Sequence, residues 1–349
     1  MASTLSDVAE RVGVSTATVS RVLRGLQEPR DPELHQRILS AARDLEYRPS
    51  PHAQALRRGR SATIRLLSSS GTAFVTNFKL CSLVSNLAQL GRPITDTRAG
   101  TMDTVENWLD ETLAAVPEAA VIFMSSDRLP VEVIADLCTQ LNDADICPMV
   151  VDYHCPTLPP EIPCDAIWVD RIEGSRMAVE HLIDQGHEKI ALIATDRADR
   201  REGYHKALES HDIGESFFGA WRGEAVGTRY ADQAREITAR LLAEEPEITA
   251  MFCQSDLVAV GAMRAVLESG RRVPDDVAIV GFDGDPWTAM LPIALTTMVQ
   301  PSEELCARAS QILAARLGGD DHSWQRIALS PKLVVRESCG ARGDRSFTV

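Results

Sequence analysis

Several side chains in this sequence occur in groupings that could support catalysis or bind a metal ion. Asp283 and Asp285, separated by one glycine, form an acidic pair of the kind that binds metals. His181 and His187 are candidate general bases, but both lie on or just beyond an amphipathic helical pattern, where packing or capping is the simpler role. The sequence has no glycine-rich phosphate loop, no G-x-S-x-G elbow and no H-E-x-x-H motif. We therefore expect no enzymatic activity, no metal and no other cofactor.

The cysteines likewise give no clear indication of a metal site. None of the eight cysteines forms a C-x-x-C pair, and they are scattered along the chain as Cys81, Cys138, Cys147, Cys155, Cys164, Cys253, Cys306 and Cys339. His154, Cys155 and Cys164 could together bind a metal, but their spacing does not match that of a zinc site. We expect reduced, buried cysteines in a cytoplasmic protein.

Charge is distributed unevenly along the chain. The whole sequence has 36 basic and 50 acidic residues, a net charge of -14, which by itself argues against a nucleic-acid partner. Residues 1–60, however, contain ten Arg, no Lys and seven acidic residues, so they carry +3 while the remainder carries −17. No apolar run approaches the ~20 residues of a membrane helix, and residues 1–7 lack the features of a secretory signal. We expect a cytoplasmic protein with a small cationic head and a large anionic body.

The first 60 residues predict short helices and no strands. One helix ends at Gly13, and a second covers residues 16–23 with Ser15 as its cap. A third begins at the Asp-Pro pair before residue 33 and runs to residue 45, and a fourth is possible over 51–58. Thr4 is placed to cap the first helix.

The first two helices and their three-residue turn resemble a helix-turn-helix, whose second helix lies in the major groove of DNA. Val14, Val19 and Val22 would pack inward. The outer surface would present Thr16, Ala17, Thr18, Ser20 and Arg21. An Arg reaches a guanine edge, small residues allow close approach and hydroxyls bind phosphate. The pattern alone fits an ordinary small helical bundle equally well.

From residue 61 the pattern changes to short apolar runs that alternate with amphipathic helices. The runs are rich in β-branched residues, as in strands buried on both faces of a parallel sheet, and cover Thr63–Leu67, Ala119–Met124, Pro148–Val151, Ala166–Val169, Lys189–Ala194, Ala250–Cys253 and Val277–Phe282. Helices between them end at Gly186 and Gly270. About 280 residues of this pattern predict two α/β lobes with parallel doubly wound sheets, which bind ligands at the carboxyl ends of their strands.

Residues 7–22 also carry a longer pattern, D-V-A-x-x-x-G-V-S-x-x-T-V-S-R-V. This stretch resembles the head of the LacI/GalR family of bacterial transcription regulators. Further matches are Tyr47-Arg48-Pro49, Val280-Gly281-Phe282-Asp283 and Leu333-Val334-Val335-Arg336-Glu337-Ser338. The resemblance implies a small all-α helix-turn-helix head followed by a two-lobed α/β domain like the periplasmic sugar-binding proteins, with parallel doubly wound sheets.

The same resemblance implies a division of the chain. The parts are a DNA-binding head at 1–48, a hinge at 49–60, an effector-binding and dimerisation domain at 61–340, and a tail at 341–349. Within that domain, lobe 1 is expected at about 61–168 and 299–328, and lobe 2 at about 169–298 and 329–340.

By position, the family's base-reading residues are Thr16, Ala17 and Arg21. Ala17 has no polar group, so it would contact a thymine methyl or nothing. Contacts to DNA phosphate are expected from Ser15, Thr18, Ser20, Arg57 and Arg58.

The hinge is open to two interpretations. By composition, residues 49–60 are a basic linker, for which a solvated tether is sufficient. The resemblance instead implies a hinge helix in the minor groove, with Leu56 wedged at the central base step and Ala53 beside it. Arg65 stands where the family usually has glycine, a departure at the point where the hinge would pack against the body.

The effector domain of the family binds a small molecule between its lobes, and the resemblance assigns Asp152, Arg200 and Asp283 to that site. Carboxylates and a guanidinium suit neighbouring sugar hydroxyls, although each could instead serve as a cap or a surface ion pair. Ser255 is a further candidate for this site, but it stands where the family usually has Asn and lacks the paired donor and acceptor of an amide. Asp256 is expected to cap a helix.

Four further residues are candidates for the effector site. Trp221 and Trp287 could stack on a sugar face or lie on the surface of a lobe. Ala73 and Phe74 follow the first strand and could border the site.

Together these features predict a sequence-specific DNA-binding transcription regulator, a repressor, that binds a palindromic operator as a homodimer in the cytoplasm, associated with the nucleoid. A small-molecule effector controls it, with a sugar or sugar derivative as the first candidate, and could either release DNA or promote its binding. The alternative is an exported sugar-binding protein without DNA activity, which the cationic head and the missing signal disfavour.

Overall fold

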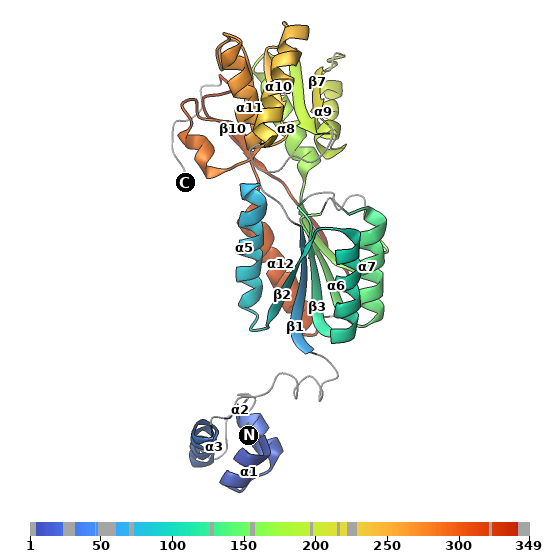
Figure 1. Ribbon diagram of the computed structural model, residues 1–349, viewed down its shortest axis with the longest axis vertical. Coiled ribbons are helices and arrows are strands. Elements are labelled where there is room, and N and C mark those ends of the chain that lie inside the picture. Colours follow the sequence, from blue (N-terminus) through green and yellow to red (C-terminus); the bar gives the residue numbers. More distant parts are fainter. Residues whose placement is uncertain are drawn as a thin grey trace. The chain divides into compact units, whose positions relative to one another are not determined.

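The computed structural model describes residues 5–23, 32–45, 47, 61–69, 73–125, 129–153, 158–195, 198–214, 217–221, 229–320 and 323–340. The chain forms two compact units. One comprises Met1–Ala62 with Ala115–Glu118, and the other Thr63–Ala114 with Ala119–Val349 (Figure 1). The described part of the first unit is mainly helical, and the second unit carries two α/β lobes.

In the described part of the head, three helices pack around one small core. These are α1 (Leu5–Val12), α2 (Thr16–Leu23) and α3 (Pro32–Asp44). Their buried side chains are Val8, Ala9, Val12, Val19, Ile38, Ala41 and Ala42. Gly13 ends α1 with a φ of 74°, a conformation that costs glycine little, and its amide donates to the carbonyl of Ala9 at 2.9 Å. The bounds expected for α2 are confirmed, while Thr4 and the helix considered for 51–58 lie outside the described residues.

Lobe 1 is a six-stranded sheet with the order β11-β5-β4-β3-β1-β2. Its strands are β1 (Ser61–Ser69), β2 (Ile94–Ala99), β3 (Pro117–Phe123), β4 (Cys147–Val151), β5 (Asp165–Val169) and β11 (Arg326–Leu329). The pairs β1–β2, β3–β4, β4–β5 and β5–β11 are parallel. Among the residues that the structure describes, the helices covering the sheet are α5 (Phe74–Ala88), α6 (Met102–Ala115), α7 (Val131–Asp143) and α12 (Ser302–Leu317).

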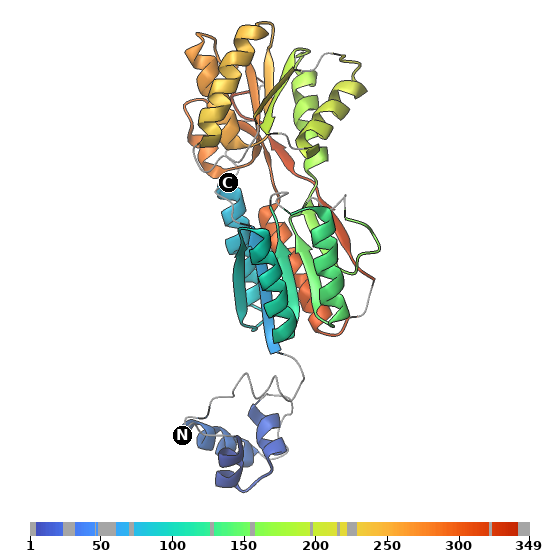
Figure 2. The ribbon, with the colours of Figure 1, turned by 45° about the vertical axis from the view of Figure 1, so that its right-hand side comes forward.

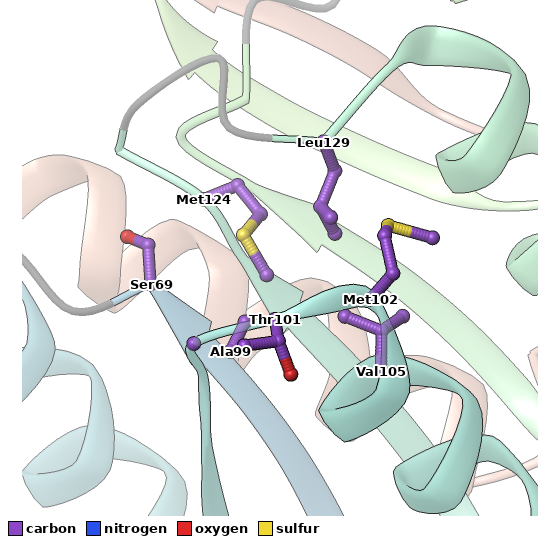
Figure 3. A pocket seen from close by; sticks show the side chains of 8 residues that line it. Ser69, Ala99, Thr101, Met102, Val105, Met124 and Leu129 are labelled. Atoms are coloured by element: carbon purple, nitrogen blue, oxygen red, sulfur yellow. The ribbon is translucent and has the colours of Figure 1, made fainter. Parts of the chain in front are cut away.

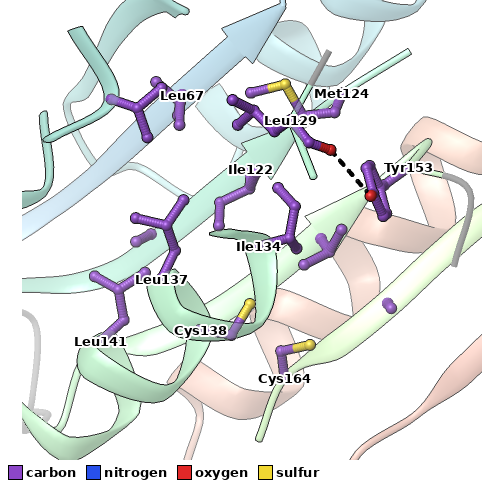
Figure 4. Close-up of a cluster of buried hydrophobic side chains, with 14 of the residues drawn as sticks. Leu67, Ile122, Met124, Leu129, Ile134, Leu137, Cys138, Leu141, Tyr153 and Cys164 are labelled. Carbon is purple, nitrogen blue, oxygen red and sulfur yellow. Dashed lines mark hydrogen bonds between the residues drawn. The ribbon is translucent and has the colours of Figure 1, made fainter. Parts of the chain in front are cut away.

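The core of lobe 1 has one layer on each face of this sheet. Side chains of α5 and α12 pack with one face, and side chains of α6 and α7 with the other. Figure 4 shows the second layer, in which Ile134, Leu137 and Leu141 of α7 face the sheet. The hydroxyl of Tyr153 donates to the carbonyl of Leu129 at 3.1 Å at its edge.

Lobe 2 repeats the plan with the order β12-β10-β9-β8-β6-β7. Its strands are β6 (Ile190–Thr195), β7 (Phe217–Trp221), β8 (Ala250–Cys253), β9 (Ala278–Asp283), β10 (Thr296–Val299) and β12 (Lys332–Val334). The pair β10–β12 is antiparallel, and the pairs β9–β10, β8–β9, β6–β8 and β6–β7 are parallel. The sheet is covered by α8 (Arg171–Asp184) and α9 (Ala198–Ser210) on one face, and by α10 (Arg229–Glu244) and α11 (Asp256–Glu268) on the other (Figure 2).

The chain passes between the lobes at three described points. It leaves lobe 1 between β5 and α8, returns between β10 and α12, and leaves again between β11 and β12. Polar residues at two of these crossings, Arg171 and Gln300, take part in the site described below. The expected fold class, a helical head and a two-lobed α/β body with mainly parallel sheets, is confirmed.

The seven strands expected from apolar runs are all present, within two residues of the expected bounds. Five further strands were not predicted, namely β2, β7, β10, β11 and β12. Arg65, which departs from the family pattern, lies in β1 and donates from Nη2 to Glu111 of α6 at 2.8 Å.

The expectation of buried cysteines is only partly correct. Among the described cysteines, Cys81 is exposed because it lies on the outer side of α5, and Cys147 is half-buried. His154 and Cys155 lie outside the described residues. Within the described ranges, no group of three or more His, Cys, Asp or Glu side chains is arranged to bind a metal. The described helices also include none that is long and apolar enough to span a membrane.

Candidate functional site

Helix α2 begins with a side-chain cap. Ser15 precedes the helix, and its hydroxyl accepts from the amide of Thr18 at 3.1 Å while lying 2.8 Å from the Thr18 hydroxyl. This cap satisfies one of the amides that a helix start leaves unpaired. The opposite side of the helix is anchored by Val19, which is fully buried, and by the partly buried Val14 and Val22, as the sequence predicted.

The residues expected to read DNA lie on the free side of α2. Thr16, Ala17 and Arg21 are exposed, and Ala17 and Arg21 are one helical turn apart on a common face. Of the residues expected at phosphate, Ser15 is exposed, whereas Thr18 and Ser20 are half-buried. The hinge residues Ala53, Leu56, Arg57 and Arg58 lie outside the described residues.

In the body of the chain, a buried polar cluster centres on Asp152, which directly follows β4 of lobe 1. Its carboxylate accepts from Lys79 Nζ at 2.7 Å and from Arg171 Nη2 at 2.7 Å, and all three side chains are buried. Burial alone would raise the pKa of Asp152, but the charges of Arg171 and Lys79 outweigh burial and lower it. Asp152 has a φ of 61°, an uncommon backbone conformation for a residue other than glycine. The pairing makes Asp152 the anion of a buried ionic triad.

Gln300 connects this triad to lobe 2. Its side-chain oxygen accepts from Lys79 Nζ at 2.6 Å, and its Nε2 donates to Asp283 Oδ1 at 2.6 Å. Asp283 ends β9 with a φ of 122°, a strained conformation of a kind that gathers at functional sites. Burial raises the pKa of Asp283, while Arg200 and Lys79 oppose that rise. Hydrogen bonds therefore run from α5 of lobe 1 to the carboxyl end of a central strand of lobe 2.

Arg200 lies in the first turn of α9 and is held on three sides. Its Nε donates to the carbonyl of Gln254 at 3.2 Å, and its Nη1 lies 3.2 Å from Asp199 Oδ2. The guanidinium carbon is 3.9 Å from the centre of the Phe282 ring, a stacking that fixes its plane. Arg200 and Asp283 are thus brought to the same end of the lobe 2 sheet, each beside Phe282.

The helix cap expected at Asp256 is supplied by its neighbour Ser255. Ser255 is the cap of α11, since its hydroxyl accepts from the amide of Val258 at 3.3 Å. Asp256 is fully buried and accepts from the Thr297 hydroxyl and, at 2.7 Å, from the amide of Asp285. The cap expected at Asp256 was wrong because the carboxylate turns toward β10 instead of its own helix. Gly281 makes room for it, since a Cβ there would lie 2.5 Å from Asp256 Oδ1.

Asp285 is the least satisfied carboxylate of this group. It is buried, its Oδ1 has no hydrogen-bond partner among the described residues, and Trp287 donates a hydrogen bond to its side chain. Burial, followed by the neighbouring charge of Asp283, raises the pKa of Asp285 to about 7. Trp287 is half-buried beside it.

The other aromatic candidates are less closely associated with these carboxylates. Phe74 and Ala73 are exposed at the start of α5, and the ring of Phe74 stacks on Phe78 with a centroid separation of 6.3 Å. Trp221 is the last residue of β7, and its side chain lies outside the described part of the chain. Lys79, Arg171 and Gln300 were not singled out from the sequence. Lys79 offered one signal, because it stands four residues from Val75 and from Leu83 on the buried side of its helix.

A cavity of about 240 Å³ opens at the carboxyl edge of the lobe 1 sheet (Figure 3). It is lined by Ser69, Ala99, Gly100, Thr101, Met102, Val105, Met124 and Leu129. Doubly wound sheets bind their ligands at this edge.

Comparison with known proteins relates both parts of the chain to characterised relatives. Residues 4–50 match the family described as bacterial regulatory proteins, lacI family, and residues 179–339 match a periplasmic binding protein-like domain. The HTH-type transcriptional repressor PurR of Mannheimia succiniciproducens is 30% identical over 343 residues, which cover 96% of this chain and 98% of the relative. The chain belongs to the lacI family of bacterial regulatory proteins. It is accordingly a DNA-binding transcription regulator and not an enzyme.

A second repressor and a solved structure are also similar to this lacI-family chain over nearly its whole length. The ribose operon repressor of Halalkalibacterium halodurans is 31% identical over 350 residues, covering 96% of this chain and 97% of the relative. Among solved structures, the Lac repressor dimer bound to operator and the anti-inducer ONPF is similar, with a TM-score of 0.78 and 26% identity over 98% of this chain and 100% of that one. The similarity therefore covers the head as well as the body.

Proposed function

We propose that this lacI-family chain is a repressor that binds a palindromic operator as a homodimer, and that a small polar molecule bound between its lobes changes its affinity for the operator. The observation that carries the proposal is the surface of α2, where Thr16, Ala17 and Arg21 are exposed above the buried Val19. A similar chain, the Lac repressor, forms a dimer on its operator. Two-fold symmetric proteins read symmetric half-sites, so a palindromic site is expected.

In this proposal the head (residues 1–48) reads DNA, the hinge (49–60) enters the minor groove, and the body (61–340) senses the effector and dimerises. Leu56 and Ala53 are assigned to the minor groove, and Arg57 and Arg58 to phosphate. Residues 61–349, the body with its tail, carry a net charge of −17 and are repelled by phosphate, which confines DNA contact to the cationic head and hinge. The protein acts where chromosomal DNA is, in the cytoplasm and associated with the nucleoid.

The effector site is assigned to the junction of the lobes, at Asp283 and Arg200 first. Asp283 is half-buried and accepts one hydrogen bond from Gln300, so its carboxylate has capacity for further donors. Asp152, Ser255, Trp287, Trp221, Phe74 and Ala73 complete the proposed site. A sugar or sugar derivative supplies the neighbouring hydroxyls that such carboxylates accept, and one relative is named for a ribose operon.

The DNA half of the proposal is tested by selecting duplexes from a random pool with the full chain and measuring their binding as salt increases. We expect a symmetric consensus and an affinity that falls steeply with salt, because phosphate contacts release counterions. A selection that returns no consensus, or binding that does not depend on salt, would count against a repressor and in favour of a binding protein without DNA activity.

The effector half is tested by a thermal-shift screen of sugars, nucleosides and phosphosugars. A molecule bound only by the native state raises the melting temperature. We expect a stabilising compound whose effect is lost in Asp283→Asn and retained in Asp110→Asn, which changes an exposed carboxylate of α6. A shift that survives Asp283→Asn unchanged would place the effector elsewhere.

A further inference from the structure

The cavity of lobe 1 is built where three neighbouring strands end. Ser69 is the last residue of β1, Ala99 is the last residue of β2, and Met124 directly follows β3. These strands are adjacent in the sheet, in the order β3-β1-β2. Figure 3 shows side chains from these strand ends and from the first turns of α6 gathered around one space. The cavity therefore lies where parallel sheets of this kind bind their ligands.

The lining of this cavity is mainly apolar. Ala99, Val105, Met124 and Leu129 are buried, whereas Met102 is 42% exposed. The space measures about 240 Å³ and is partly open to the surface beside the exposed Met102, so that an apolar group can enter it from outside. An engineered apolar cavity of about 150 Å³ binds benzene, whereas whole ligand sites measure roughly 300–1,000 Å³. The space suits one aromatic ring or one branched alkyl group, and not a complete effector.

Hydrogen bonds link the polar rim of the cavity to the effector site. The hydroxyl of Ser69 accepts from the amide of Ser125 at 3.2 Å, and the hydroxyl of Ser125 accepts from Thr76 at 3.1 Å. The same Ser125 hydroxyl donates to the carboxylate of Asp152. Ser125 therefore connects Ser69, at the rim of the cavity, to Asp152 of the buried ionic triad.

We infer that this cavity is the apolar subsite of the effector site, and that the effector joins a hydrogen-bonding polar part to an alkyl or aryl group of up to about the size of a phenyl ring. The inference rests on the proposed function, since it places the cavity beside the junction of the lobes assigned to the effector. The polar part is held by Asp283 and Arg200, and the apolar group enters among Met102, Met124 and Leu129.

The test uses fluorobenzene as the probe and the full-length chain, with binding followed by fluorine NMR. Ala99→Leu fills the cavity, and Asn107→Leu adds the same side chain to the exposed face of α6 as the matched control. We expect saturable binding in the wild type and in Asn107→Leu, and binding at least tenfold weaker in Ala99→Leu. Absent binding in the wild type, or equal binding in Ala99→Leu, would overturn the inference.

A crystal of the wild type soaked with bromobenzene provides a second measurement that does not depend on how Ala99→Leu folds. We expect the bromine anomalous peak among Met102, Met124 and Leu129, and a peak only at other positions would overturn the inference.

Compounds that stabilise the chain in the thermal-shift screen should also displace fluorobenzene, and a stabilising compound that leaves it bound would contradict a shared site. Operator binding measured on the same samples separates the two proposals, because a chain that retains salt-dependent DNA binding but rejects fluorobenzene contradicts this inference alone.

Discussion

Lys79 and Asp152 form a fully buried ion pair, with Nζ 2.7 Å from Oδ2, between the first helix of lobe 1 and the end of its strand β4. The same ammonium donates to Gln300, whose amide donates in turn to Asp283 of lobe 2. Charges of this kind are costly to bury and are stable only when all their partners are present. The junction of the lobes therefore depends on a complete polar network, and any ligand that enters must replace the hydrogen bonds it breaks.

Asp152→Asn should lower the free energy of unfolding by about 3–5 kcal/mol, because Lys79 and Arg171 then remain buried without a carboxylate. Lys79→Met should cost less, since Asp152 keeps its bond to Arg171. Urea unfolding of both variants measures the difference. Arg264→Ala, which removes an exposed pair with Glu268, is the control and should change stability by less than about 1 kcal/mol. Equal losses for Asp152→Asn and this control would contradict the network.

Asp285 should make the folded state less stable as pH rises from about 4 to about 7. Its pKa is raised to about 7 in the folded chain, compared with about 3.9 in an unfolded one. Between these values the native state holds a proton that the unfolded state has lost, so stability falls as pH rises. Asp285→Asn should remove this contribution and gain stability relative to the wild type between pH 5 and pH 7.5. Urea unfolding at both values tests this, and a variant whose difference from the wild type is independent of pH would contradict it.

Ile38→Ala should destabilise the head without affecting the body. Ile38 is fully buried in the core that joins the three head helices, and truncation of such a side chain costs about 2–5 kcal/mol. Because the head and body are separate compact units, DNA binding should be lost at a temperature that leaves the main calorimetric transition unchanged. Gln36→Ala, an exposed position of α3, is the control. A shift of the main transition by Ile38→Ala would show that the units do not unfold independently.

The strands that the sequence predicted are those with unbroken apolar runs. β3 and β8 are buried along almost their whole length, so their sequences carry a strong signal. β2 was missed because it lies at an edge of its sheet and reads Ile-Thr-Asp-Thr-Arg-Ala, a largely polar run in which Thr95, Asp96 and Arg98 are exposed. β7 is likewise an edge strand, and β12, with three residues, is too short to show a period.

The residues of the candidate site were predictable only where a local sequence pattern marked them. Asp283 follows an apolar strand and Arg200 begins a helix, so their places in the chain indicated a role. Lys79 lies 73 residues from Asp152 and 221 residues from Gln300. A lysine in a helix is ordinarily solvated, and the carboxylate and amide that make its burial possible meet it only after both lobes have folded. Local patterns carry no information about such long-range pairs.

The central claim, that α2 reads operator DNA, is tested most directly by the affinity of Arg21→Ala for the selected operator, measured by fluorescence anisotropy. Arg264→Ala removes an arginine from the surface of lobe 2 and is the matched control. We predict a loss of about 1–3 kcal/mol of operator binding for Arg21→Ala, with relaxed preference at one base pair of each half-site, and no change for the control. An Arg21→Ala chain that binds the operator with wild-type affinity and specificity would contradict the account.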